Sequence, residues 1–202
     1  MSFVNPLREG PVVFVAAVGG AEGARGAAAA LACAGADADA AALLVDLGGR
    51  VPRPTLIASA AARKLEERLG AHLPQAKVAA RGQVCHLALP ASAEGLASAA
   101  AAATVAREAI TAVHLPPGLL QPALTGSSVR TSGVLLRADL RDDRALVGLT
   151  VRDLLDRGIP ASVLKQRLSW VAERRALFGV LPPGSPGAPP SRLVSRFAGA
   201  GR

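Results

Sequence analysis

The chain has 202 residues and a formal net charge of +8; half of its residues are hydrophobic and only 2% are aromatic. This length is sufficient to bury one hydrophobic core, so we expect a single domain. No apolar run reaches the roughly 18 residues of a spanning helix, and the N-terminus lacks a secretion signal pattern. We therefore expect a cytoplasmic protein. Most of the excess positive charge lies in residues 130–202. Because aromatic side chains for base stacking are scarce, we do not expect nucleic acid as a partner.

Short buried strands alternate with helical segments along the chain. Apolar runs predict strands at residues 11–18, 41–47, 83–89, 110–115, 133–140 and 161–167. Alanine-rich or amphipathic runs predict helices at residues 24–36, 55–69, 92–110, 142–157 and 168–178. The alternation predicts an α/β fold, a three-layer α/β/α domain with a mainly parallel sheet over residues 8–180. Residues 181–202 are predicted to be a Pro/Gly-rich linker and a flexible basic C-terminal tail.

The sequence VGGAEGARG after the first strand has the outline of a phosphate-binding turn. Such a turn binds phosphate through backbone N–H groups at a helix N-terminus. The predicted contacts are Gly19, Gly20, Gly23, Arg25 and Gly26. A P-loop that hydrolyses ATP also needs a lysine and a hydroxyl that holds magnesium. Neither is present, because no Lys precedes residue 64 and no Ser or Thr lies between residues 3 and 54.

Two other interpretations of this loop remain open. The spacing partly fits a dinucleotide-binding turn, with Asp46 at the end of the second strand as the ribose-binding carboxylate. Reductase chemistry with a catalytic tyrosine is excluded, because the chain has no tyrosine. Alternatively, the glycines allow only a tight turn and close packing of the alanine helix, and Asp46 is a turn-capping residue.

The carboxyl ends of parallel strands meet at one edge of a sheet, where ligands bind. This rule places His114 and Asp139 beside the glycine loop and Asp46, as the lining of a remnant pocket. His114 has three interpretations: a histidine satisfied by the backbone, a pocket residue, or a base that lacks an evident partner. No catalytic residue and no metal site is predicted, since the histidines and cysteines have no metal-ligand spacing.

The segments VVFVAAVGGAEGARGAAAALA, AALLVDLGG, AVHLPPG and GVLLRADLRDDRALVGLTVRDLLDRGIPASVLKQR, in this order, resemble the ParA/MinD family of deviant P-loop ATPases. The similarity is to its degenerate branch associated with pilus assembly and septum placement, and it covers about residues 11–167. It implies a nucleotide site at the glycine loop and Asp46. It also implies protein partners in a membrane-associated assembly such as a pilus, secretion or division apparatus, and a homodimer or a heterodimer with a paralogue.

This sequence differs from the family at the residues that carry out ATP hydrolysis. Val18 stands in place of the signature lysine, and His114 stands where the family has a magnesium-organising Asp. We therefore expect a pseudo-ATPase, a scaffold or regulator that binds ATP or another nucleotide without magnesium-dependent hydrolysis. The alternatives are a Rossmann-type dinucleotide-binding protein of unknown reaction and a basic DNA-associated partition factor.

The C-terminal residues have a pattern similar to the membrane-targeting helix of MinD-type members. Apolar Leu193, Val194 and Phe197 share one helical face, and Arg192 and Arg196 lie on the other. The resemblance implies weak contact with anionic lipid and a peripheral position at the inner membrane face. A basic tail without membrane contact is the other interpretation.

Overall fold

The computed structural model describes residues 10–19, 21–36, 40–49, 57–106, 110–126, 130–139, 144–182 and 184–199. In these residues the strands are β1 Val12–Val18, β2 Ala42–Leu47, β3 Lys77–Arg81, β4 Val84–Leu89, β5 Thr111–Leu115, β6 Gly133–Ala138 and β7 Ala161–Leu164. The helices are α1 Ala24–Gly35, α2 Ala60–His72, α3 Ala93–Val105, α4 Leu120–Gly126, α5 Arg144–Asp156, α6 Trp170–Leu177 and α7 Ser191–Gly199.

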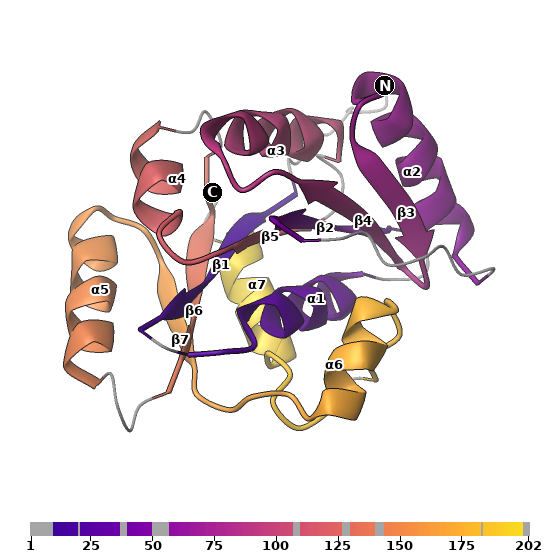
Figure 1. The fold of residues 1–202 in the computed structure, drawn as a ribbon. Coiled ribbons are helices and arrows are strands. Elements are labelled where there is room, and N and C mark those ends of the chain that lie inside the picture. Colours follow the sequence, from indigo (N-terminus) through magenta and orange to yellow (C-terminus); the bar gives the residue numbers. More distant parts are fainter. Residues whose placement is uncertain are drawn as a thin grey trace, which may run out of the picture.

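The strands form one sheet in the order β3-β4-β2-β5-β1-β6-β7 (Figure 1). All neighbouring pairs are parallel except β3–β4, which is an antiparallel hairpin. Helices α2, α3, α4 and α5 contribute to the core on one face of the sheet. Helices α1, α6 and α7 contribute to the core on the other face, which we call the α1 face. The predicted three-layer α/β/α fold with a mainly parallel sheet is confirmed.

The central unit is the β1–α1 pair, and its sequence explains its position. β1 has an uninterrupted apolar run, as expected for a parallel strand covered on both faces. Helix α1 buries Ala27 to Ala32 without interruption, because alanine side chains let it lie close to the sheet. At its end, a Cβ on Gly35 would lie 2.3 Å from Cγ2 of Ile110, so only glycine fits there.

Two elements were not predicted, β3 and α4, and a helix at α7 was predicted only through the resemblance to a membrane-targeting helix. β3 precedes the predicted third strand and pairs with it as a hairpin across Gly82, which has a φ of 52°. Helix α2 begins at Ala60, where the Ser59 hydroxyl accepts a hydrogen bond from the N–H of Ala62. The predicted start of this helix, Thr55, lies outside the described residues.

The C-terminal segment differs from the flexible tail expected from its sequence. Helix α7 lies against α1, and Phe197 is 0% exposed in the core of the α1 face. The described part of the proline-rich segment before it leads back along the same face, with Gly187 close to the backbone of Arg167. The apolar positions predicted to contact lipid therefore pack inward, with Leu193 and Val194 half-buried.

Candidate functional site

The glycine loop joins β1 to α1 at the carboxyl edge of the sheet. Gly19 has a φ of 63° and Gly23 a φ of 86°, both in the left-handed region that glycine adopts at no steric cost. Gly23 is the N-cap of α1 and supplies no side-chain hydrogen bond, and the first turn contains no acidic residue. No side chain of the helix itself therefore compensates the partial positive charge at its N-terminus, which can attract an anion. Gly20 lies outside the described residues.

Arg25, Asp46 and His114 form one hydrogen-bonded cluster beside this loop. Arg25 Nε donates to Asp46 Oδ2 over 2.5 Å, and His114 Nδ1 lies 2.7 Å from Asp46 Oδ1. The strands explain the second contact, since Asp46 of β2 and His114 of β5 are register partners. A Cβ on Gly49 would lie 1.8 Å from Asp46 Oδ2, so glycine is required where the chain passes the carboxylate.

Asp46 is the buried centre of this cluster, with only 4% of its surface exposed. Burial by itself would raise the pKa of its carboxyl group. The hydrogen bond from His114 and the positive charge of Arg25 outweigh burial and hold the pKa of Asp46 below its ordinary value. Asp46 is therefore an anion whose two oxygens each have a partner.

The structure gives His114 a carboxylate partner that the sequence did not reveal. Because a carboxylate only accepts, Nδ1 of a neutral His114 ring carries the proton, and Nε2 is then an acceptor. The His114 side chain is 16% exposed. Asp139 is exposed and follows β6, which lies two strands from β5 in the sheet. It therefore shares the carboxyl edge of the sheet with His114 but is not next to it. The described residues contain no group of three or more His, Cys, Asp or Glu side chains able to hold a metal ion.

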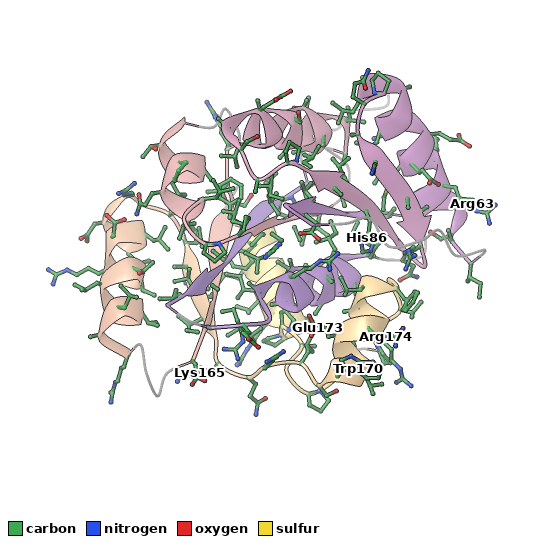
Figure 2. All side chains as sticks on the ribbon, viewed as in Figure 1. Arg63, His86, Lys165, Trp170, Glu173 and Arg174 are labelled. Atoms are coloured by element: carbon green, nitrogen blue, oxygen red, sulfur yellow. The ribbon has the colours of Figure 1, made fainter. Side chains whose placement is uncertain are left out.

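Two residues from the region of α6 close over the loop, and sequence reasoning missed both. Arg167 Nη1 lies 2.7 Å from Glu22 Oε2, and the Arg167 stem covers Gly23, whose Cβ would lie 3.3 Å from Cγ. Glu173 lies against the first turn of α1, since a Cβ on Gly26 would be 2.8 Å from its Cγ. Figure 2 shows Glu173 on the side of α6 toward α1, and Trp170 and Arg174 on the outer side.

A third missed residue, Arg137 of β6, lies on the α1 face of the sheet near the same edge. It is 5% exposed, Nη1 donates to the Ala138 carbonyl over 2.5 Å, and Nε has no hydrogen-bond partner in the described residues. Its register partner on β1 is Ala17, two residues before the loop glycine Gly19. Because arginine is mostly exposed in proteins, the sequence predicts a surface residue here, and only the strand register reveals that Arg137 is buried.

His86 of β4, labelled in Figure 2, is a buried histidine on the α1 face. Its Nε2 has no hydrogen-bond partner among the described residues. Burial is the main cause that lowers the pKa of His86 from 6.5 to about 4. The charges of Arg81 and Arg25 act in the same direction, and Asp46 opposes them. The ring is therefore neutral near pH 7.

This shift predicts a pH dependence of stability. The unfolded chain binds a proton at His86 between pH 6.5 and about 4 where the folded chain does not, so stability falls as the pH falls through this window. The contribution lost between pH 7 and pH 5 is about 2 kcal/mol. Urea unfolding at both pH values should show His86→Leu losing about 2 kcal/mol less than the wild-type protein. Equal losses in both proteins would contradict this assignment.

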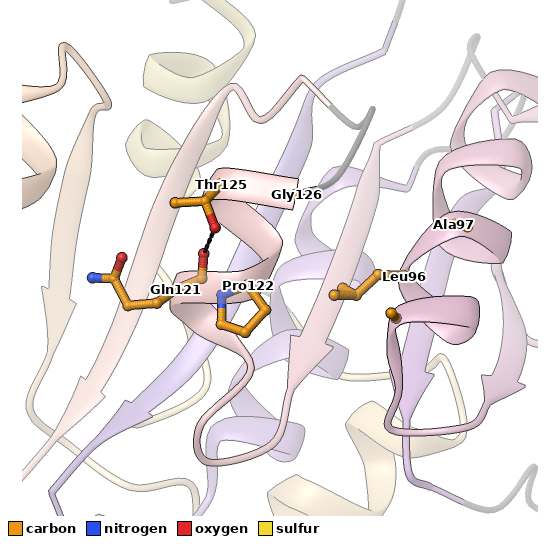
Figure 3. A pocket seen from close by; sticks show the side chains of 7 residues that line it. Leu96, Ala97, Gln121, Pro122, Thr125 and Gly126 are labelled. Carbon is orange, nitrogen blue, oxygen red and sulfur yellow. Dashed lines mark hydrogen bonds between the residues drawn. The ribbon is translucent and has the colours of Figure 1, made fainter.

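A cavity of about 500 Å³ lies between α3 and α4, away from the glycine loop (Figure 3). Its lining includes Leu96 of α3 and Gln121, Pro122 and Thr125 of α4. Both helices cover the face of the sheet opposite α1. The cavity is therefore separate from the cluster around Asp46.

No protein-family model matches this chain, and comparison with curated proteins and with solved structures also finds no match. Function must therefore be argued from the site alone. Across the described residues, no helix has both the length and the apolar character needed to cross a membrane.

Proposed function

We propose that this protein is a ParA/MinD-like pseudo-ATPase. It binds a nucleotide at the glycine loop without hydrolysing it and acts as a scaffold or regulator of a membrane-associated assembly. The observation that carries the proposal is the N-terminus of α1. Gly23 leaves it without a side-chain cap, and the basic residue of its first turn, Arg25, is bonded to the Asp46–His114 pair. Backbone amides can receive a phosphate there, because they need no particular side chain.

The same geometry argues against hydrolysis. A magnesium-dependent site needs a hydroxyl or a carboxylate oxygen that is available to the ion and its water shell. The loop offers no hydroxyl, and the two oxygens of Asp46 are bonded to Arg25 and His114. A planar guanidinium also replaces the compact ammonium of a P-loop lysine poorly. The site thus favours binding over turnover.

Ligand binding is tested by thermal unfolding with ATP, GTP and NADH, each with and without magnesium. A nucleoside triphosphate at about 100 times its Kd should add about 2.7 kcal/mol, which raises Tm by about 5–10 °C for a chain of this size. Arg152→Ala removes an exposed arginine of α5 and is the matched control for Arg25→Ala. It should show the same rise in Tm with ligand as the wild-type protein. Phosphate release should not rise on addition of magnesium.

Each alternative outcome has a distinct meaning. Magnesium-stimulated ATP turnover that disappears in Arg25→Ala would overturn the pseudo-ATPase. Stabilisation by NADH alone would favour the dinucleotide-binding alternative, and salt-dependent retardation of DNA would favour the partition factor.

The resemblance also implies self-association, or pairing with a paralogue, across the nucleotide face. Sedimentation of the protein with and without ATP tests the self-association.

A further inference from the structure

Arg137 is a buried cation for which the described residues provide no counter-ion. Within the part of the chain that the structure describes, its guanidinium makes one hydrogen bond, to a neutral carbonyl, and its Nε has no partner. Among the described residues, no carboxylate forms an ion pair with it, and Glu22 of the glycine loop is paired with Arg167. Buried charges in proteins are normally paired, because removal from water without compensation is costly. A guanidinium in this state indicates an anion that binds here.

The strand register gives the position of this cation. Leu135 and Val15, which point in the same direction as Arg137 and Ala17, belong to the core of the α1 face. The hydrogen bond from Nη1 to the Ala138 carbonyl holds the guanidinium at the carboxyl end of β6. On the neighbouring strand the chain leaves β1 at Val18 and turns through Gly19 into the loop that starts α1. Arg137 therefore lies on the side of the sheet, and at the edge, where α1 begins.

We propose that Arg137, together with the first-turn amides of α1, binds a phosphate group of the nucleotide. In this arrangement an arginine from β6 supplies the charge that the loop lysine supplies in hydrolysing P-loop proteins. The inference rests on the proposed function, because it assigns a binding residue to the same site. A guanidinium has five N–H donors and pairs well with phosphate oxygens, and its charge is permanent.

Glu173 is an acidic side chain beside the proposed phosphate site and opposes phosphate binding there. Its side chain lies against Gly26 in the first turn of α1, where its negative charge is attracted by the positive end of the helix. A phosphate at the first-turn amides would be repelled by this neighbouring carboxylate. Glu173→Gln should therefore raise phosphate affinity, about three- to tenfold, whereas loss of Arg137 should lower it.

A bridging water is the competing explanation for the unpaired Nε. Ser162 of β7 also has a buried Oγ with no hydrogen-bond partner in the described ranges, and its register partner Leu135 lies two residues before Arg137 on the same face. A water between Nε and Oγ would satisfy both atoms but would leave the charge uncompensated. Ser162→Ala separates the two explanations, because it removes the water site and keeps the anion site.

The experiment compares the wild-type protein with Arg137→Met, Arg137→Gln and Ser162→Ala. Thermal unfolding is measured without ligand, with sodium phosphate and with ATP; adenosine, which has no phosphate, is the ligand control. We expect Arg137→Met and Arg137→Gln to lower phosphate and ATP affinity at least tenfold. Their Tm without ligand should equal or exceed that of the wild-type protein, because an uncompensated charge has been removed. Ser162→Ala should keep wild-type affinity.

The outcomes separate this inference from the proposed function. If the wild-type protein binds ATP and both Arg137 variants bind it equally well, the inference fails and the proposed function stands. If the wild-type protein binds sodium phosphate through Arg137 but binds no nucleotide, the inference stands and the proposed function fails. A lower Tm in both Arg137 variants with unchanged affinity, or affinity lost in Ser162→Ala alone, also overturns the role of Arg137.

Discussion

Phe197→Ala is expected to lower the free energy of unfolding by about 3–5 kcal/mol, the range for removing a fully buried aromatic ring. Phe197 is 0% exposed although it stands five residues from the end of the chain. Its ring lies over Gly133 of β6, where a Cβ would come within 2.4 Å of Cε1. Urea unfolding followed by circular dichroism measures the change.

The control is Arg192→Ala, which removes an exposed side chain of the same helix and should change stability by less than about 0.5 kcal/mol. If Phe197→Ala were as mild as this control, α7 would not be docked in solution. The result also bears on the lipid contact predicted for Arg192, Leu193, Val194, Arg196 and Phe197. That contact stays a prediction, and it requires α7 to leave the sheet, because the docked helix does not present Phe197 to a bilayer.

The sequence predicted the elements that carry a strong local signal. β1 is a continuous apolar run and β2 is apolar except for Asp46, a pattern typical of parallel strands covered on both faces. β3 was missed because KVAAR is short and contains two basic residues. Helix α4 was missed because LQPALTG is only seven residues long and contains a proline. Helix α7 follows several prolines and glycines, and Phe197 anchors it on Gly133 of β6, which is distant in the sequence.

The candidate site was predictable to the extent that a topological rule determines it. The rule that ligands bind at the carboxyl edge of a parallel sheet was enough to bring Asp46 and His114 together. Their direct contact depends on the register of β2 against β5, which local sequence does not encode. Arg137, Arg167 and Glu173 were missed because arginine and glutamate are usually surface residues, and only long-range packing brings these three to the loop.

Asp46→Ala is expected to lower the free energy of unfolding by about 3 kcal/mol at pH 7. The substitution removes the common acceptor of Arg25 and His114 at a position that is 4% exposed, and breaking a buried charged network costs about this much. Asp153→Ala, which removes an exposed acceptor of Arg157 on α5, is the matched control and should cost less than 1 kcal/mol. A loss no larger than that of the control would contradict the cluster.

The pH dependence of this effect has a defined sign. The pKa of Asp46 is lower in the folded chain than in the unfolded chain, so its contribution is complete above the unfolded value and is lost as the pH falls through the folded value. Asp46→Asn keeps the size of the side chain and removes the titration. Between pH 7 and pH 3 this variant should therefore lose less stability than the wild-type protein in urea unfolding.

The same variant decides what Asp46 does for a ligand. If Asp46 contacts a nucleotide ribose, Asp46→Asn should weaken nucleotide binding. If its role is to hold Arg25 through the 2.5 Å hydrogen bond, the variant loosens a cation next to the uncapped helix N-terminus, and binding of a phosphate should become tighter. Stability and affinity then change in opposite directions in one protein. Lower stability with higher phosphate affinity is expected if Asp46 orders the site through Arg25. If Asp46 contacts the ligand, its substitution should lower both stability and affinity.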